Sequence, residues 1–332
     1  MVRILLLRTW LTNIGNGFID KGAKALLEQA APDSTIIEVS GYPNISAERK
    51  AKGEIGNISN VLGVPQIRNG SPDIQDRMVN IADFVDADVA VLPGCILYEF
   101  ALDAYHDLLK RLNRRNIPII FLGAGGGNYE AGTQRYVRKV IDSLHSPAII
   151  TRDQTAYDCY SSEFEHSFSG IDCAFYISDW YEPPTSTNDF VISAFDRAEE
   201  TNFTTELPVI RPHHNPFMKP HEGAVKNLIW GQKNQEYFES ENIFMSDTLE
   251  DYLFLYANTD VTYSDRIHSC VPTLAYGNKA MFDFKTPRAK LFDQILEEDI
   301  TEGPVRLPEQ VLQDKKEKQI NQVKDILREV VG

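Results

Sequence analysis

The side chains with the most chemical capability cluster in residues 260–269, DVTYSDRIHS. The segment begins as a short apolar strand, turns at Ser264 and Asp265, and is expected to open a helix at Arg266. A helix N-terminus presents unpaired backbone N–H groups and attracts anions. Arg266 adds a guanidinium that can clamp phosphate or carboxylate, and His268 adds an imidazole that transfers protons near neutral pH. The pattern predicts an enzyme site for a small anionic substrate.

A structural role is the alternative for this pair, with Arg266 bound to Asp265 and His268 packed under the helix. Two donor-rich side chains in the first turn would repel the positive end of the helix dipole unless an anion binds there. A structural role would more naturally use Asp or Glu at these positions. The sequence therefore favours a ligand-binding role for Arg266 and His268.

A second arginine follows another predicted strand, at residues 148–151. Arg152 and Asp153 come directly after it, and Asp153 or Thr155 can cap the next helix. Two interpretations stay open for Arg152. It forms a structural pair with Asp153, or it is a second cation directed at the ligand.

Two further loops could contact a ligand through backbone and amide groups. Residues 123–129, GAGGGNY, contain three successive glycines, which allow close backbone approach because they lack Cβ. This loop has neither the dinucleotide nor the P-loop spacing, so a tight strand-to-helix turn is the alternative. The loop expected at residues 12–17 suits sugar or phosphate binding and tight turns equally. The substrate-binding candidates in the two loops are Asn13, Gly15, Asn16, Gly125, Gly126, Gly127 and Asn128.

The elements that must position these residues alternate between strand and helix. In the first half, strands are expected at 2–7, 34–39, 88–92, 117–122 and 148–151, and helices near 20–29, 74–84, 101–113, 132–144 and 155–161. In the second half, strands are expected at 190–195, 208–210, 261–263 and 280–282, and helices near 249–257, 289–296 and from 266. This alternation predicts an α/β fold of two Rossmann-like, doubly wound parallel sheets. Ligands bind outside the carboxyl ends of such strands, so two facing sheets would bring the candidate loops into one cleft.

The domain division follows from chain length and from a Pro-rich linker at residues 179–188. A chain of 332 residues exceeds what one hydrophobic core usually serves. We predict an N-terminal domain of residues 1–183 and a C-terminal domain of residues 184–308. A long amphipathic helix at residues 309–332 is expected to pack on the first domain or to bridge both. Residues 41–73 are polar and rich in Gly, Asn, Pro and Ser, which predicts a long loop.

Composition narrows the class of partner. A net charge of −15 argues against nucleic acid, whose binding requires basic patches. The longest apolar runs are strand-sized, so no integral membrane segment is predicted, and the N-terminus lacks a signal-peptide pattern, which favours the cytoplasm. The four cysteines form no CxxC pair, and the histidines lack metal-binding spacing, so no metal site is predicted. His213 and His214 are expected on the surface or in a loop.

Several of these segments occur in the same order in the polysaccharide pyruvyl transferase family, which the chain resembles over most of its length. They are residues 13–16 (NIGN), 117–127, 151–153 (TRD), 170–175 (GIDCAF), 264–268 (SDRIH) and 277–288. Arg152, Arg266 and His268 match the family's two arginines and its histidine. Ser264 opens the main motif, and Arg288 ends the basic segment, so both join the candidate substrate-binding residues. The chain departs from the family at residues 93–95 (Pro-Gly-Cys) and at Ser269, where the family usually has glycine.

The resemblance implies a fold similar to GT-B glycosyltransferases and transfer of a pyruvyl group from phosphoenolpyruvate. The acceptor would be two hydroxyls of a glycan sugar, which form a cyclic ketal, and no cofactor is implied. Arg152 and Arg266 would hold the donor's phosphate and carboxylate, and His268 would act as general acid or base. Two alternatives remain: a glycosyltransferase that uses a nucleotide sugar, and a catalytically silent glycan-binding relative.

Overall fold

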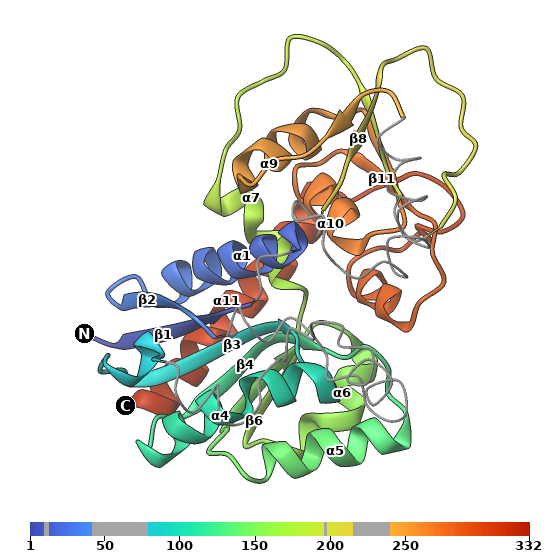
Figure 1. Ribbon diagram of the computed structural model, residues 1–332. Helices are drawn as coiled ribbons and strands as arrows, with labels where there is room; N and C mark the ends of the chain where they lie inside the picture. The colour runs from blue at the N-terminus through green and yellow to red at the C-terminus, as the bar shows by residue number, and fades with distance from the viewer. Residues whose placement is uncertain (10–12, 42–78, 196–197, 215–239) are drawn as a thin grey trace, which may run out of the picture.

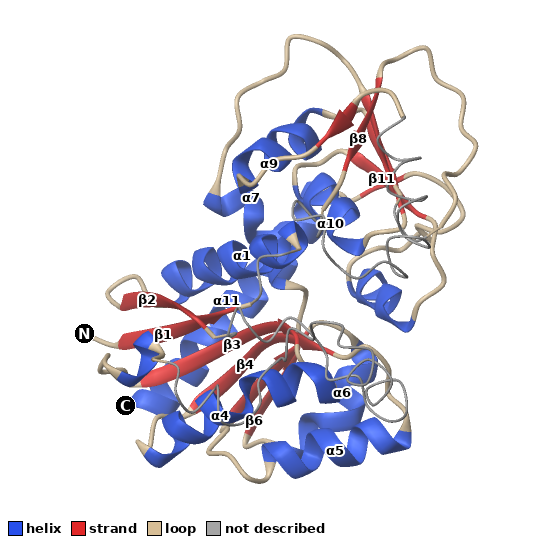
Figure 2. Cartoon of the chain, in the orientation of Figure 1, coloured by secondary structure: helices blue, strands red, loops and turns tan. Residues whose placement is uncertain are grey.

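The computed structural model describes residues 1–9, 13–41, 79–195, 198–214 and 240–332. These residues form two sheets of six strands each, with helices packed around them (Figure 1, Figure 2). The predicted α/β class with two parallel-sheet domains is therefore confirmed.

The first sheet is parallel throughout, in the order β2-β1-β3-β4-β5-β6. Its strands are β1 (Arg3–Arg8), β2 (Thr35–Ser40), β3 (Val89–Cys95), β4 (Ile119–Gly125), β5 (Ala148–Thr151) and β6 (His166–Ser169). In β1, Ile4 and Leu6 enter one hydrophobic cluster, whereas Leu5 and Leu7 enter another. Successive side chains point to opposite faces of a strand, so both faces of this sheet are buried.

Helices cover both faces of the first sheet (Figure 2). α1 and α11 contribute to the cluster on one face, and α4 and α5 contribute to the cluster on the other. The helices of this domain are α1 (Ile14–Ala30), α4 (Glu99–Arg114), α5 (Ala131–Ile141), α6 (Gln154–Tyr160), α7 (Ile177–Trp180) and α11 (Glu309–Val331). Short 3-10 helices are η2 (Ile81–Asp83), η3 (Ser161–Glu163) and η4 (Cys173–Tyr176).

The second sheet has the order β12-β11-β10-β7-β8-β9, and only the edge pair of β11 and β12 is antiparallel among its described strands. Its strands are β7 (Val191–Ala194), β8 (Val209–Pro212), β9 (Ile243–Phe244), β10 (Val261–Ser264), β11 (Lys279–Phe282) and β12 (Val305–Arg306). Its helices are α9 (Leu249–Asn258), α10 (Ile267–Ala275) and the 3-10 helix η5 (Pro287–Gln294).

The C-terminal helix α11 returns from the second sheet and packs on the first domain. Figure 1 shows it, in red, beside α1. The Gln319 side chain accepts the N–H of Ile171 at 2.7 Å and donates to its carbonyl at 3.3 Å. Lys316 Nζ donates to Asp179 Oδ1 at 2.7 Å. Both ends of the chain thus build the first domain.

Four local predictions were wrong. α1 begins at Ile14 rather than near residue 20, because Asn13 caps it and accepts the N–H of Gly15 at 3.0 Å. β6 was missed because its sequence, HSFS, has little apolar character and is only partly buried. The helix expected at residues 289–296 is a 3-10 helix that begins at Pro287. The predicted loop at 41–73, apart from Gly41, and residues 74–78 of the predicted helix lie outside the described residues. The described end of that helix, residues 79–84, was also predicted wrongly, because it contains only the 3-10 helix η2.

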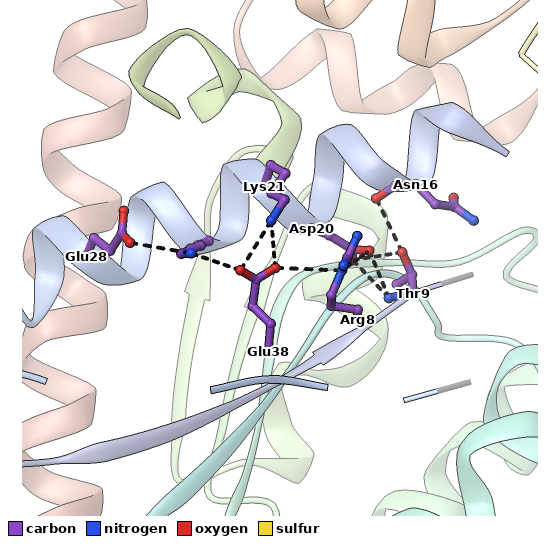
Figure 3. Close-up of polar contacts among 8 residues, drawn as sticks. Arg8, Thr9, Asn16, Asp20, Lys21, Glu28 and Glu38 are labelled. Carbon is purple, nitrogen blue, oxygen red and sulfur yellow. Dashed lines mark hydrogen bonds and ion pairs between the residues drawn. The ribbon is translucent and has the colours of Figure 1, made fainter. Parts of the chain in front are cut away.

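A buried carboxylate on α1 lies against the end of β1. Asp20 is fully shielded from solvent and accepts the backbone N–H of Thr9 at 2.9 Å and its hydroxyl at 2.8 Å. Arg8 Nε lies 3.7 Å from the same carboxylate, and also 3.7 Å from Glu38 (Figure 3). Burial raises the pKa of Asp20 to about 7, against the opposing effect of the hydrogen bonds from Thr9.

Replacing Asp20 by asparagine should stabilise the protein above pH 7. The folded pKa lies above the unfolded value, so the contribution of Asp20 is fully present below pH ~4 and is lost as the pH rises through about 7. Asparagine can still accept from Thr9 but has no charge to desolvate, so a gain on the order of 2 kcal/mol is expected at pH 8. Urea unfolding at pH 5 and pH 8 measures it. Asp33→Asn, at an exposed position, is the control, and a gain that is equal at both pH values would contradict this account.

Candidate functional site

The motif from Ser264 to His268 forms the turn between β10 and α10, and Arg266 is the N-cap residue. Pro272 lies inside α10, where it has no N–H for the carbonyl of His268, four residues earlier, and its ring crowds that carbonyl. The backbone of His268 accordingly leaves the helical region, with φ −85° and ψ 18°. The proline therefore explains the kinked first turn that carries the imidazole.

The structure gives Ser264 a positioning role. Its buried hydroxyl donates to the carbonyl of Ala194 at 2.8 Å and accepts the N–H of Arg266 at 2.9 Å. These bonds fasten the motif's turn to the neighbouring strand β7. The hydroxyl thus fixes the position of Arg266, and a substrate contact by Ser264 stays a prediction.

Arg152 and His268 meet at one buried carboxylate, that of Asp172. Arg152 Nη1 donates to Asp172 Oδ2 at 2.7 Å, and His268 Nε2 lies 3.6 Å from the same oxygen. The other carboxylate oxygen accepts the N–H of Ala174 at 2.9 Å, at the start of η4. The structural interpretation that paired Arg152 with Asp153 was therefore wrong in its partner. Asp153 instead caps α6 by accepting the N–H of Ala156.

The charges around Asp172 fix its protonation and that of its neighbours. Burial alone would raise the pKa of Asp172, but the charge of Arg152 is the largest of the opposing influences, and the pKa lies well below its usual range. Burial is also the largest influence on His268 and lowers the pKa of its imidazole, with Asp172 opposing and the charges of Arg152 and Arg288 adding to the decrease. At neutral pH the site therefore contains a carboxylate and a neutral imidazole that can accept a proton.

Arg288 brings a further cation from the second domain. It lies at the start of η5, where the Thr286 hydroxyl accepts its N–H at 3.4 Å. Its Nη2 donates to Cys95 Sγ, at the end of β3, at 2.8 Å. Near this contact, Lys290 Nζ donates to Thr155 Oγ1 at 3.2 Å. The strand-end segments of the first sheet thus meet the second domain at η5.

Three buried donor atoms in this group have no hydrogen-bond partner among the described residues: Arg152 Nε, His268 Nε2 and Arg288 Nε. An unpaired buried donor costs about 1–3 kcal/mol, and such atoms in a folded protein call for an explanation. A ligand rich in acceptor oxygens would satisfy them. We name this group of Arg152, Asp172, His268 and Arg288 the Asp172 cluster.

Arg266 is a buried cation at the start of α10. Its side chain is buried, and burial lowers its pKa to about 10, so the guanidinium stays charged at neutral pH. The pKa of His268 is affected by Asp172 and Arg288. The decrease in the pKa of Arg266, in contrast, is caused by burial. The structure thus groups Arg288 with His268, whereas a ligand contact by Arg266 stays a prediction.

Two of the predicted ligand-contact glycines instead make room for the site's own side chains. A Cβ at Gly125 would lie 2.3 Å from Arg152 Nε, and a Cβ at Gly15 would lie 2.7 Å from His268 Cβ. The lack of Cβ is required at both positions, as predicted for Gly125, and the group that approaches is a protein side chain. Gly15 and Gly125 therefore set the positions of the imidazole and the guanidinium.

The remaining candidates in the two loops are Gly126, Gly127, Asn128, Asn13 and Asn16. Gly126 donates its N–H to the Tyr129 hydroxyl at 2.9 Å, and that hydroxyl donates to Asp153 at 2.7 Å. Gly127 is half-buried and Asn128 is exposed. Asn13 uses its side-chain oxygen to cap α1, and Figure 3 shows Asn16 on the first turn of that helix, where its carbonyl accepts the Thr9 hydroxyl.

His214 lies in the loop after β8, as one of the two predicted positions had it, but it is buried rather than on the surface. Its backbone carbonyl accepts the N–H of Ile14 at 2.9 Å, and its Nε2 lies 3.2 Å from the hydroxyl of Ser269. Tyr256 donates to the same serine at 3.1 Å. The serine that replaces the family's usual glycine therefore joins α10 to His214, which holds the N-terminus of α1.

Two kinds of feature are absent from the residues that the structure describes. They contain no group of three or more His, Cys, Asp or Glu side chains that could hold a metal ion. No described helix has both the length and the apolar character that crossing a membrane requires.

Gly15→Ala should impair the site with little loss of stability. Alanine is a better helix former than glycine by up to about 1 kcal/mol, but its Cβ would press on the Cβ of His268 at 2.7 Å. We expect kcat/KM to fall roughly tenfold or more, since small displacements of a reacting group are costly. Gly132→Ala in α5 is the matched control, because a Cβ there meets nothing within 4 Å. Equal activity of both variants would contradict the close packing of Gly15 on His268.

Solved structures with the same architecture identify the class of fold. The Staphylococcus aureus MnaA–UDP co-structure has a TM-score of 0.52 at 13% identity, covering 98% of this chain and 91% of that one. A putative UDP-N-acetylglucosamine 2-epimerase from Listeria monocytogenes has a TM-score of 0.50 at 10% identity, covering 98% and 91%. These likenesses show the fold alone. A search of curated proteins found no significant match.

The two sheets, with charged side chains from both domains at their junction, define a protein of the GT-B fold class. The family model for polysaccharide pyruvyl transferase matches residues 13–279. The chain belongs to the polysaccharide pyruvyl transferase family.

Proposed function

We propose that the protein transfers a pyruvyl group from phosphoenolpyruvate onto two hydroxyls of a glycan sugar and forms a cyclic ketal. Membership of the family supports the reaction class. The observation that carries the proposal is the convergence of Arg152 and His268 on Asp172, with Arg288 supplied by the other domain. This arrangement combines fixed positive charge with a neutral imidazole.

The donor carries a phosphate and a carboxylate, and the site offers cations for both. Arg288 and Arg152 each have a buried Nε without a hydrogen-bond partner in the described structure, and a donor oxygen would pair with each. Arg266 is the N-cap of α10, where backbone N–H groups favour an anion. In this proposal, Arg152 and Arg288 hold one anionic group of the donor and Arg266 contacts the other.

His268 moves the proton. Asp172 lies on the Nε2 side of the ring, at 3.6 Å, so the tautomer with hydrogen on Nε2 is favoured and Nδ1 is left to accept. Nδ1 takes the proton of the attacking sugar hydroxyl and returns it to the methylene carbon of the donor. As the methylene carbon gains the proton and becomes a methyl group, the double bond is lost. The sugar oxygen bonds to the central carbon of the donor. Asp172 fixes the ring, as the carboxylate does in other acid–base pairs.

The second hydroxyl completes the ketal. It attacks the same carbon, the bond from carbon to the phosphate oxygen breaks, and phosphate leaves with the electron pair. The proton of this hydroxyl passes to His268 or to the departing phosphate. The scheme calls for no metal or cofactor. Phosphoenolpyruvate is a cytoplasmic metabolite, so we propose that the reaction occurs in the cytoplasm.

Ligand-induced changes in melting temperature separate this proposal from its main rival, a nucleotide-sugar enzyme of the same fold. A ligand that binds only the folded state stabilises it by RT ln(1 + [L]/Kd), about 2.7 kcal/mol at a hundredfold excess over Kd. We expect phosphoenolpyruvate to raise Tm by several degrees, and Arg288→Met to lose most of that rise. A rise with UDP-N-acetylglucosamine and none with phosphoenolpyruvate would favour the rival. A rise with an oligosaccharide alone would favour a silent glycan-binding protein.

A further inference from the structure

Cys95 is a partly accessible thiol at the edge of the Asp172 cluster. It is the last residue of β3 and lies in the segment where the chain departs from its family. Its Sγ accepts a hydrogen bond from Arg288 Nη2 at 2.8 Å. Across the sheet its register partner is Gly125, the glycine whose missing Cβ makes room for Arg152 Nε. The thiol is therefore flanked by guanidinium groups from two domains.

Cys95 contributes to the electrostatics of both arginines. It is the largest cause that raises the pKa of Arg288, against burial. Burial would lower the pKa of Arg152, but the charges of Cys95 and Asp172 raise it well above its ordinary value. The thiolate is the nucleophilic form of cysteine, and electropositive, partly exposed surroundings are typical of reactive cysteines.

A second observation indicates that an anion fits beside the thiol. The Arg152 side chain is almost completely buried, at 1% exposure, and its Nε has no hydrogen-bond partner among the described residues. Arg288 is only half-buried, but its Nε is a buried atom that also has no hydrogen-bond partner among the described residues. A small carboxylate or phosphate bound to these donors would lie next to Cys95 Sγ.

We propose that Cys95 is a modification site for small anionic electrophiles, which the arginines of the Asp172 cluster hold beside the thiol. The sulfur gives up its proton to solvent and attacks the electrophilic carbon, a carbon–sulfur bond forms, and the leaving group departs with its electron pair. With iodoacetate, the product is S-carboxymethylcysteine and free iodide. The added carboxylate stays paired with Arg288 and Arg152, so modification blocks the anion site and switches the protein off.

The other cysteines provide internal controls. Cys159 is also partly accessible, but burial is the largest cause that raises the pKa of its thiol. Cys173 and Cys270 are fully buried, and burial raises the pKa of both thiols. The inference therefore predicts an order of reactivity in which Cys95 reacts first, Cys159 follows, and the two buried thiols react on unfolding.

The test measures the initial alkylation rate of each cysteine in the intact folded protein by peptide mass mapping. Iodoacetate and its neutral counterpart iodoacetamide are compared at equal concentration. Because electrostatic attraction raises association rates by 10-fold or more, the iodoacetate-to-iodoacetamide rate ratio should be about tenfold higher at Cys95 than at Cys159. Inorganic phosphate should slow carboxymethylation of Cys95, relative to sodium chloride at the same ionic strength. Arg288→Lys should keep much of the ratio and Arg288→Met should lose it.

Equal ratios at Cys95 and Cys159, or a failure of phosphate to protect Cys95, would overturn the proposal. The comparison of Cys95 with Cys159 in the wild-type protein tests the proposal even if an Arg288 variant folds poorly. The inference does not depend on the identity of the donor. A selective, phosphate-protected Cys95 in a protein without pyruvyl transfer would contradict the proposed function alone, whereas an active transferase with an unselective Cys95 would contradict this inference alone.

Discussion

His268→Ala should lower kcat/KM for pyruvyl transfer by about 10²–10⁴, the usual contribution of a positioned acid–base group. The loss arises because the neutral imidazole is the group in the Asp172 cluster that can both accept and return a proton. Stability should change much less than activity, because the buried carboxylate of Asp172 keeps its 2.7 Å contact with Arg152. Steady-state kinetics with phosphate release as the signal, together with Tm, measure both effects.

His145→Ala is the matched control, because that histidine is exposed and makes its described hydrogen bonds through its backbone N–H and carbonyl. The pH profile gives a second check. Burial lowers the pKa of His268 below its ordinary value of ~6.5, and a base acts above its pKa. Activity should therefore be level around pH 7 and decline only on the acid side, below the range of an exposed histidine. Near-normal turnover of His268→Ala would remove the imidazole from the mechanism.

Asp172→Asn should have the largest effect on stability, a loss of about 3–5 kcal/mol, because it leaves the buried charge of Arg152 without its partner. Asparagine can still accept the N–H of Ala174, so the start of η4 is preserved. The folded pKa of Asp172 is depressed, so its stabilising contribution is present above the unfolded pKa and is lost as the pH falls toward the folded value. Urea unfolding at pH 7 and near pH 3 should show the difference from wild type shrinking in acid.

A double variant separates the structural role of this pair from its chemical role. Arg152→Met combined with Asp172→Asn removes both buried charges, and replacing a buried ion pair by apolar groups is often nearly neutral for stability. The double variant should therefore recover much of the stability that Asp172→Asn loses, yet stay inactive because His268 has no carboxylate and the donor has lost a cation. A loss of stability in the double variant equal to the sum of the losses in the two single variants would show that the two charges do not interact.

The sequence predicted the first sheet well where its strands are buried on both faces. β1, β3, β4 and β5 are nearly continuous apolar runs, so their burial is visible in composition alone. β6 lacks that signal, and the carboxylate that follows it was missed as a consequence. The only feature of the sequence that pointed to Asp172 was its place in the segment 170–175, which resembles the family. Its importance depends on its contacts with Arg152 and His268, which are far away in the sequence.

The glycines illustrate a different limit. Lack of Cβ at Gly125 correctly indicated a close approach, but the sequence does not say what approaches, and the packing of Gly15 on His268 was not predicted. Contacts between domains are hidden for the same reason. Arg288 and Cys95 are 193 residues apart, and their pairing depends on how the second domain packs against the end of β3.

The most direct measurement is incubation of the purified protein with phosphoenolpyruvate and a panel of candidate glycans, followed by mass spectrometry and phosphate assay. The account predicts that one glycan gains the mass of a single pyruvyl ketal, with one phosphate released for each ketal formed and neither change with His268→Ala. A glycan extended from a nucleotide sugar, with no ketal formed from phosphoenolpyruvate, would contradict it.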